Sequence, residues 1–266
     1  MQMKNKDIII VLIILLAVIV IGLIAFLVVC LKSGDNFLTH FGNWGRNGTE
    51  VILDENYESQ KINKIEISSN AGDVKIEKGM DENVRVVVYG KETADVTVSQ
   101  NGNELRIDTT RVTRHWSFFS SYVNDIIVYV PESYSGEMAI KNSYGNCKAV
   151  DLENATMTID SDCGDIDLQR IKNVKIKCDY GDVDIGSVLN RVEVEASCGD
   201  IEVDNLLIKE NSSIKCDFGD IKIKHTDSVY VDADVDLGDV KIKENDRSSS
   251  ITLTVRADCG DVKVGE

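Results

Sequence analysis

The dipeptide Gly-Asp recurs through most of this 266-residue chain and constrains its fold more than any other feature. From Gly145 onward the corner glycines lie 19, 17, 18, 20, 19 and 22 residues apart. This regular spacing indicates stacked structural repeats, each built in the same way. The dipeptide begins at Gly72, Gly164, Gly181, Gly199, Gly219, Gly238 and Gly260, with Gly145-Asn146 as a variant.

Apolar and polar residues alternate on both sides of each glycine. In one repeat Val174, Ile176 and Cys178 alternate with charged residues before Gly181. Period-two alternation is typical of a half-buried strand. A unit of two short strands cannot bury its own apolar face, whereas a stack of such units can. The pattern therefore predicts an all-β fold, a β-solenoid similar to a parallel β-helix, with rungs about 4.8 Å apart.

Residues 51–131 are equally rich in strand patterns but less regular. We expect them to form longer rungs or a capping part continuous with the repetitive solenoid of residues 132–266. A separate small β domain is the alternative. Within this part, Asn101-Gly102 lies between two alternating segments and predicts a hairpin.

The first residues indicate a membrane anchor. Residues 8–31 form a run of 24 uncharged residues, which as a helix would span roughly 36 Å, enough for a bilayer core of about 30 Å. The flanking lysines Lys4 and Lys6 favour a cytoplasmic tail at 1–7. We expect a single-pass protein of the cell membrane, with a stalk at 32–50 and an extracytoplasmic C-terminal domain. A cleaved form, or one lipidated at Cys30, is the alternative.

The expected outer part is strongly acidic. Residues 32–266 hold 27 of the 29 Lys and Arg and 44 of the 45 Asp and Glu, a net charge of −17. This charge argues against a nucleic-acid partner, because phosphate contacts need a basic surface. The residue three positions after each corner glycine is acidic in the middle repeats and basic toward both ends. This column predicts either a solvated face or an acidic band that binds a cationic peptide or protein; its members are Lys75, Lys148, Asp167, Asp184, Glu202, Lys222, Lys241 and Lys263.

Two segments and the repeat together resemble a known family. They are INKIEISSNAGDVKIEKG (62–79), IIVYVPES (126–133) and the GD[IV]x[IV] units. Over about residues 50–266 the chain is similar to bacterial membrane-anchored β-strand-repeat proteins of unknown function that are known as "putative adhesins". Some members accompany envelope-stress systems of the Lia type, whose signal is damage by cationic antimicrobial peptides. The resemblance implies a surface-exposed β-solenoid and an envelope-stress role, and it supplies no catalytic residues.

Five corners carry a second aspartate, in the pattern D-x-G-D. Stacked carboxylates about 5 Å apart repel each other, so calcium bound between them is one interpretation. The other is that each carboxylate accepts hydrogen bonds from turn amides. The candidate calcium ligands are Asp162, Asp165, Asp179, Asp182, Asp217, Asp220, Asp236, Asp239, Asp258 and Asp261.

Cysteines and one aromatic segment complete the candidates. The alternation places all six outer cysteines inward as free thiols, with one or two disulfides between rungs as the alternative; they are Cys147, Cys163, Cys178, Cys198, Cys216 and Cys259. Residues 111–123 break the alternation and form either a core cover or a loop for membrane, glycan or protein contact. The candidate ligand-binding residues of this segment are Arg111, Arg114, His115, Trp116, Phe118, Phe119 and Tyr122.

The last repeat ends at Val264, which predicts an uncovered C-terminal rung open to end-to-end self-association or strand addition. Together these features predict a non-enzymatic binding or structural module without a cofactor, apart from the calcium interpretation. Its expected partners are the membrane, through residues 8–31, and an envelope component, protein or cationic peptide. A calcium-stiffened adhesin is one alternative. A carbohydrate-active β-helix enzyme is the other, and it would need a groove with non-repeating acidic and basic residues.

Overall fold

A computed structural model describes residues 50–90, 96–110 and 124–265. These residues belong to one compact unit, Gly48–Glu266. They form nineteen strands and a single 3-10 turn, and all the strands join in one hydrogen-bonded sheet. The prediction of an all-β solenoid is confirmed for this part of the chain.

The elements follow the chain in this order: β1 (Glu50–Glu58), η1 (Ser59–Lys61), β2 (Lys64–Ser69), β3 (Val74–Lys78), β4 (Asn83–Gly90), β5 (Thr97–Asn101), β6 (Glu104–Asp108), β7 (Asp125–Val130), β8 (Glu137–Tyr144), β9 (Cys147–Ala149), β10 (Leu152–Cys163), β11 (Ile166–Tyr180), β12 (Val183–Cys198), β13 (Ile201–Leu206), β14 (Ser212–Phe218), β15 (Ile221–Thr226), β16 (Tyr230–Leu237), β17 (Val240–Ile242), β18 (Thr252–Cys259) and β19 (Val262–Val264).

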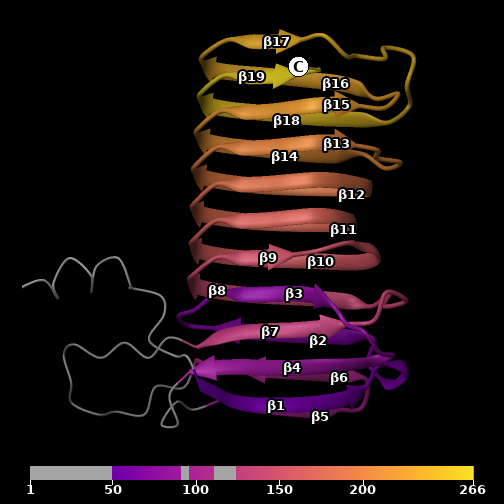
Figure 1. Ribbon diagram of the computed structural model, residues 1–266. Coiled ribbons are helices and arrows are strands. Elements are labelled where there is room, and N and C mark those ends of the chain that lie inside the picture. Colours follow the sequence, from indigo (N-terminus) through magenta and orange to yellow (C-terminus); the bar gives the residue numbers. More distant parts are fainter. Residues whose placement is uncertain (1–49, 91–95, 111–123, 266) are drawn as a thin grey trace, which may run out of the picture. The chain divides into compact units, whose positions relative to one another are not determined.

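Each rung consists of one strand before the corner glycine and one after it. Strands before the corner pair in parallel with one another, as in Ile176↔Val194, and strands after it do the same, as in Ile166↔Val183. The rungs therefore stack with two outer faces, here called the first face (before the corner) and the second face (after it), as Figure 1 shows. The long strands β11 and β12 each end one rung and begin the next.

The stacking order differs from the sequence order at both ends. The rung of β18 and β19 lies between β14–β15 and β16–β17. Similarly, β2–β3 lies between β6–β7 and β8–β9. In Figure 1 the C-terminus accordingly lies beneath β17. The prediction that the C-terminal rung is the uncovered end is wrong, because the long connection from Lys243 to Ile251 carries the chain back past β16–β17.

The N-terminal strands continue the solenoid with a change of direction. Strand β4 pairs antiparallel with both β1 and β7. Strands β5 and β6 form the predicted antiparallel hairpin, and Gly102 in its turn has a φ of 62°. Because β6 and β7 pair with β2 and β3, this part shares the sheet of the repeats.

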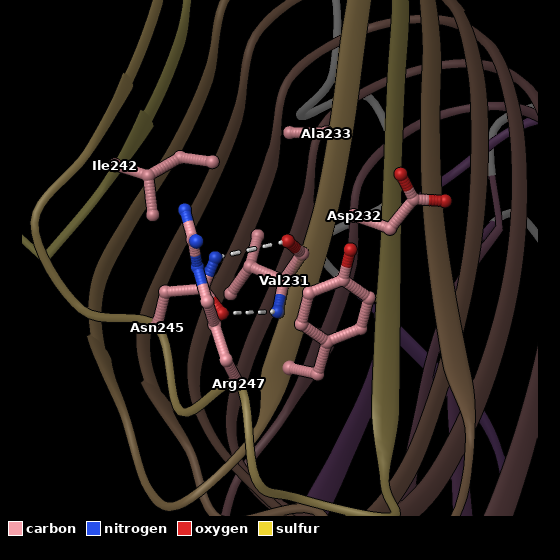
Figure 2. A pocket seen from close by; sticks show the side chains of 7 residues that line it. Val231, Asp232, Ala233, Ile242, Asn245 and Arg247 are labelled. Carbon is pink, nitrogen blue, oxygen red and sulfur yellow. Dashed lines mark hydrogen bonds between the residues drawn. The ribbon is translucent and has the colours of Figure 1, made fainter.

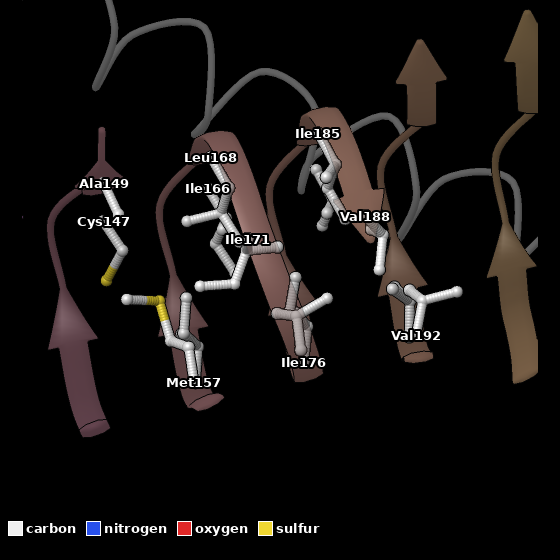
Figure 3. Close-up of a cluster of buried hydrophobic side chains, with 14 of the residues drawn as sticks. Cys147, Ala149, Met157, Ile166, Leu168, Ile171, Ile176, Ile185, Val188 and Val192 are labelled. Carbon is white, nitrogen blue, oxygen red and sulfur yellow. The ribbon is translucent and has the colours of Figure 1, made fainter. Parts of the chain in front are cut away.

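The core lies between the two faces and consists of stacked aliphatic side chains. Equivalent residues of successive rungs, such as Ile166 and Val183, are fully buried one above the other. Figure 3 shows side chains of this core, such as Leu168 and its neighbour Ile185, lying side by side along the stack. The alternation thus predicts the buried positions seven, five and three residues before the glycine, as in Met157, Ile159 and Ser161.

Candidate functional site: the Gly-Asp edge

The Gly-Asp corners stack into one straight edge of the solenoid. We call it the Gly-Asp edge and define it as each corner glycine with the residue before it and the residue after it. The eight corner glycines have φ values of 126–150°, which L side chains rarely adopt. A Cβ on Gly181 would lie 2.3 Å from the carbonyl oxygen of Gly164 in the neighbouring rung. Glycine is therefore required both for its backbone conformation and for the close approach of the rungs.

The residue after the glycine ties each rung to the next. The backbone N–H of Asp182 donates to Oδ1 of Asp165, and the N–H of Asp200 donates to Oδ1 of Asp182. Asn146 takes part in the same way, so the contact needs a side-chain oxygen and not a charge. The acceptors, at 2.8–3.1 Å, are Asp125, Asp73, Asn146, Asp165, Asp182, Asp200, Asp220 and Asp261.

These contacts favour the hydrogen-bonding interpretation of the corner aspartates. Of the ten candidate calcium ligands, Asp165, Asp182, Asp220 and Asp261 accept backbone hydrogen bonds, and Asp239 donates its N–H to Asp261. The other five lie two residues before the glycine on the first face: Asp162, Asp179, Asp217, Asp236 and Asp258. Within residues 50–90, 96–110 and 124–265, no group of three or more His, Cys, Asp or Glu side chains is placed to hold a metal ion.

The residue before the glycine forms an exposed apolar column along the edge. Its large members are 60–69% exposed and include Tyr144, Tyr180 and Phe218. Continued to this position, the period-two alternation would place the residue inward, and this is wrong, because the chain turns at the next residue and the side chain lies on the outside of the corner. In spatial order the column is Tyr144, Cys163, Tyr180, Cys198, Phe218, Cys259 and Leu237.

The six cysteines fall into two groups, and all are free thiols. Cys163, Cys198 and Cys259 are half-buried members of the exposed column, which corrects the prediction that all six point inward. The other three are buried, as expected. Burial raises the pKa of the Cys147 thiol to about 12 and the pKa values of Cys178 and Cys216 to about 11 each.

Beside the edge, the second face carries the predicted acidic band. Asp167, Asp184 and Glu202 are direct neighbours in successive rungs. Lysines continue the column at both ends and form ion pairs with the band. Nζ of Lys148 lies 3.1 Å from Oδ2 of Asp167, and Nζ of Lys222 lies 3.7 Å from Oε2 of Glu202. Partial burial and then the charges of Glu202 and Asp167 raise the pKa of Asp184 above its ordinary value. The carboxylates of the band thus repel one another at its centre.

The first face has a different charge pattern. The column four residues before each glycine alternates in sign apart from the neighbouring cations Lys215 and Arg256, and Lys141 lies beside Asp160 at 3.8 Å. Its members are Lys141, Asp160, Lys177, Glu195, Lys215, Arg256 and Asp234 in stacking order. Alternating signs offset each other along the stack. Negative charge is therefore concentrated along the Gly-Asp edge, in the acidic band at the centre of the second face, and in the first-face column of aspartates two residues before the glycine.

A shallow hollow of about 580 Å³ lies at the outermost rung, β16–β17. The side chain of Asn245 both donates to and accepts from the backbone of Val231, as a neighbouring strand would (Figure 2). The single carboxylate of the hollow, Asp232, is ion-paired with Arg256 at 2.7 Å. This hollow therefore lacks the pair of carboxylates on which glycoside hydrolysis depends.

Comparison with known proteins identifies the family. The family model described as Toastrack DUF4097 matches residues 62–265. The chain belongs to the Toastrack DUF4097 family. The match covers nearly all of the described Toastrack domain, and the predicted resemblance to "putative adhesins" is confirmed. No curated protein matches.

Three solved structures are similar to the Toastrack domain at low sequence identity. A "putative cell adhesion protein" from Clostridium sporogenes is 16% identical with a TM-score of 0.37, over 81% of this chain and 99% of that one. A "putative adhesin" from Bacteroides fragilis is 14% identical with a TM-score of 0.49, over 82% and 98%. A "putative lipid binding protein" from Parabacteroides distasonis is 12% identical with a TM-score of 0.40, over 80% and 96%.

Two sets of predicted residues lie outside the part of the Toastrack chain that the structure describes. One is the aromatic segment with Arg111, Arg114, His115, Trp116, Phe118, Phe119 and Tyr122. The other is the predicted membrane span, residues 8–31. Among the described residues, no helix has the length and apolar character needed to cross a membrane. Sequence reasoning missed the exposed column, although its signal, an aromatic residue or cysteine before nearly every corner glycine, is visible in the sequence.

Proposed function

We propose that this protein is a non-enzymatic binding or structural module of the bacterial cell surface. Residues 8–31 hold it in the membrane with the Toastrack domain outside. Its acidic surface, made of the Gly-Asp edge and the acidic band, binds a cationic partner: an envelope component, a protein or a cationic peptide. In this role it serves as an adhesin or as an accessory of the envelope-stress response.

The acidic band is the observation that supports this proposal. Asp184 lies between two other acidic residues, and its pKa is raised. A cationic chain placed along the band would lower this repulsion, so binding and carboxylate ionisation reinforce each other. A rigid stack of parallel rungs holds the carboxylates at a fixed spacing of about 4.8 Å, which suits an extended partner.

The repetitive character of the polar residues supports a role without catalysis. Catalytic acids and bases need a unique group in a cleft that excludes water. Here the exposed carboxylates recur from rung to rung, and the corner aspartates are engaged in backbone contacts. Binding of an extended partner along the stack needs only such repeated carboxylates and no unique group.

A pull-down of the full chain with a cationic antimicrobial peptide, at low and moderate salt, tests the proposal. Binding is expected at low salt and should weaken as salt screens the charges. A variant with Asp167→Asn, Asp184→Asn and Glu202→Gln removes the band. A matched control with Asp160→Asn, Glu195→Gln and Asp234→Asn removes the same charge from the first face.

The band variant should lose most of the binding, and the control should retain it. Two results would contradict the proposal: no binding even at low salt, or equal losses in the two variants. The second result would mean that only the net charge matters and that the band is not a binding surface.

A further inference from the structure

The exposed column of the Gly-Asp edge has a two-rung period that the acidic band lacks. Tyr144, Tyr180 and Phe218 occupy alternate rungs, and each is 60–63% exposed. Cys163 and Cys198, which are much smaller, occupy the rungs between them. Rungs about 4.8 Å apart place the rings about 9.6 Å apart along a straight line of roughly 19 Å.

This spacing matches the repeat of one kind of polymer. In an extended β-1,4-linked glycan, every second sugar presents the same face, and the two-sugar repeat is close to the spacing of alternate rungs. The C–H face of a sugar ring is apolar and packs on aromatic rings, whose faces carry partial negative charge. Sugars that stack on the three rings would leave the sugars between them above the cysteines.

The charges beside the column limit the chemistry of the occupant. Asp179 lies before Tyr180 and Asp182 lies two positions after it, so carboxylates flank the column on both sides at this rung. The same arrangement surrounds Phe218, with Asp217 and Asp220, whereas Tyr144 has the uncharged Ser143 and Asn146 in these positions. An anionic polymer, or a second copy of this edge, would bring like charges together.

Free amino groups on the glycan would complement both carboxylate columns. In an extended β-1,4-linked chain, the substituents at carbon 2 point alternately to the two sides. A glucosamine polymer therefore presents ammonium groups to each side in turn, opposite the aspartates. We propose that the Gly-Asp edge is a docking platform for an extended β-1,4-linked glycan that carries free amino groups. This inference rests on the proposed function of a surface-binding module and names the chemistry of its partner.

Titration of the full chain with a β-1,4-linked glucosamine hexasaccharide tests the inference. The test variant is Tyr144→Ser with Tyr180→Ser and Phe218→Ser. The matched control is Tyr230→Ser, which removes an exposed aromatic residue, 38% exposed, from outside the column. A second control, Tyr180→Phe, keeps the ring and removes only the hydroxyl.

The hexasaccharide should bind the wild type and both controls, and binding should fall at least about tenfold in the triple variant, because it loses three stacking contacts. An α-1,4-linked glucose hexasaccharide, which curves, should not bind. The N-acetylated β-1,4-linked hexasaccharide should bind more weakly, because it lacks the ammonium groups. Alkylation of Cys163 and Cys198 should slow when the glucosamine hexasaccharide is bound. This decrease in rate should be smaller in the triple variant than in the wild type.

Three results would overturn the inference: no binding of the glucosamine hexasaccharide, unchanged affinity in the triple variant, or equal binding of the α-linked control. A parallel titration with poly-lysine distinguishes failure of the glycan inference from failure of the proposed function. Binding of poly-lysine without binding of the hexasaccharide would leave a cationic-peptide module and refute the glycan platform. Absence of binding to both would refute the proposed function as well.

Discussion

The stacked glycines of the Gly-Asp edge are the most sensitive point of the fold, and replacement of Gly181 by alanine tests this. At a φ of 144°, a backbone conformation that is essentially restricted to glycine costs about 1–3 kcal/mol for any other residue. The new Cβ would also lie 2.3 Å from the carbonyl oxygen of Gly164. This contact forces two rungs apart.

Separation of the rungs at this point weakens two backbone hydrogen bonds. The N–H of Gly164 donates to the carbonyl oxygen of Tyr180 at 2.9 Å, and the N–H of Ile166 donates to that of Asp182 at 2.9 Å. At about 1 kcal/mol for each bond, the total loss of stability for Gly181→Ala is about 3–5 kcal/mol. Gly102→Ala is the control, because Gly102 also has a positive φ, 62°, but a Cβ there meets nothing within 4 Å. It should cost about 1–2 kcal/mol.

Urea unfolding of the full-length variants, followed by far-UV circular dichroism, measures the difference between the two substitutions. Because repeat proteins can open in parts, hydrogen exchange at the amides of Gly164 and Ile166 complements the unfolding curves. Faster exchange at both amides is expected in Gly181→Ala and not in Gly102→Ala. Equal destabilisation by the two substitutions would refute the argument that the close approach of the rungs requires glycine.

Two further predictions concern the acidic band and the rung order. The pKa of Asp184 is raised in the folded state, so the folded protein binds more protons than the unfolded one as pH rises through that range, and stability falls. Asp184→Asn should therefore raise the free energy of unfolding at neutral pH by a few tenths of a kcal/mol for this exposed group, seen as a higher urea midpoint, and should change it little near pH 3. Equal shifts at both pH values would contradict this. The rung order is tested with cysteine pairs in a background where the edge cysteines are replaced by serine. Lys222→Cys with Lys263→Cys should form a disulfide under mild oxidation, because these two residues are neighbours in the register. Lys222→Cys with Lys241→Cys should not, because the rung of Lys263 lies between them. The opposite pattern, read by gel mobility, would mean that the rungs stack in sequence order.

Much of the solenoid could be predicted because its information is local. The period-two alternation gives the buried residues of each strand, and the repeat spacing gives the length of a rung. The alternation fails at one position, the residue before the glycine, since the turn places Tyr180 outside although the pattern would place it inside. Period-two alternation describes an extended strand, so it no longer holds at the residue next to the turn.

The rung order could not be predicted, because it depends on contacts between distant segments. Any rung can pair with any other, since all of them present similar Val and Ile ladders and the same corner. The gap of 22 residues before Gly260 was the single local indication of a longer connection. Likewise, the antiparallel pairing of β4 with β1 and β7 follows from tertiary contacts and leaves no mark in the alternation.

The edge itself provides the most direct test of the claim that it binds a cationic partner. Alkylation of the full chain, followed by mass spectrometry, should modify Cys163, Cys198 and Cys259 quickly. The buried thiols Cys147, Cys178 and Cys216 should react slowly, because burial raises their pKa values. With a saturating cationic ligand bound, the three edge thiols should become protected while the reactivity of the buried three does not change. Edge thiols that react equally fast with and without the bound ligand would contradict this claim.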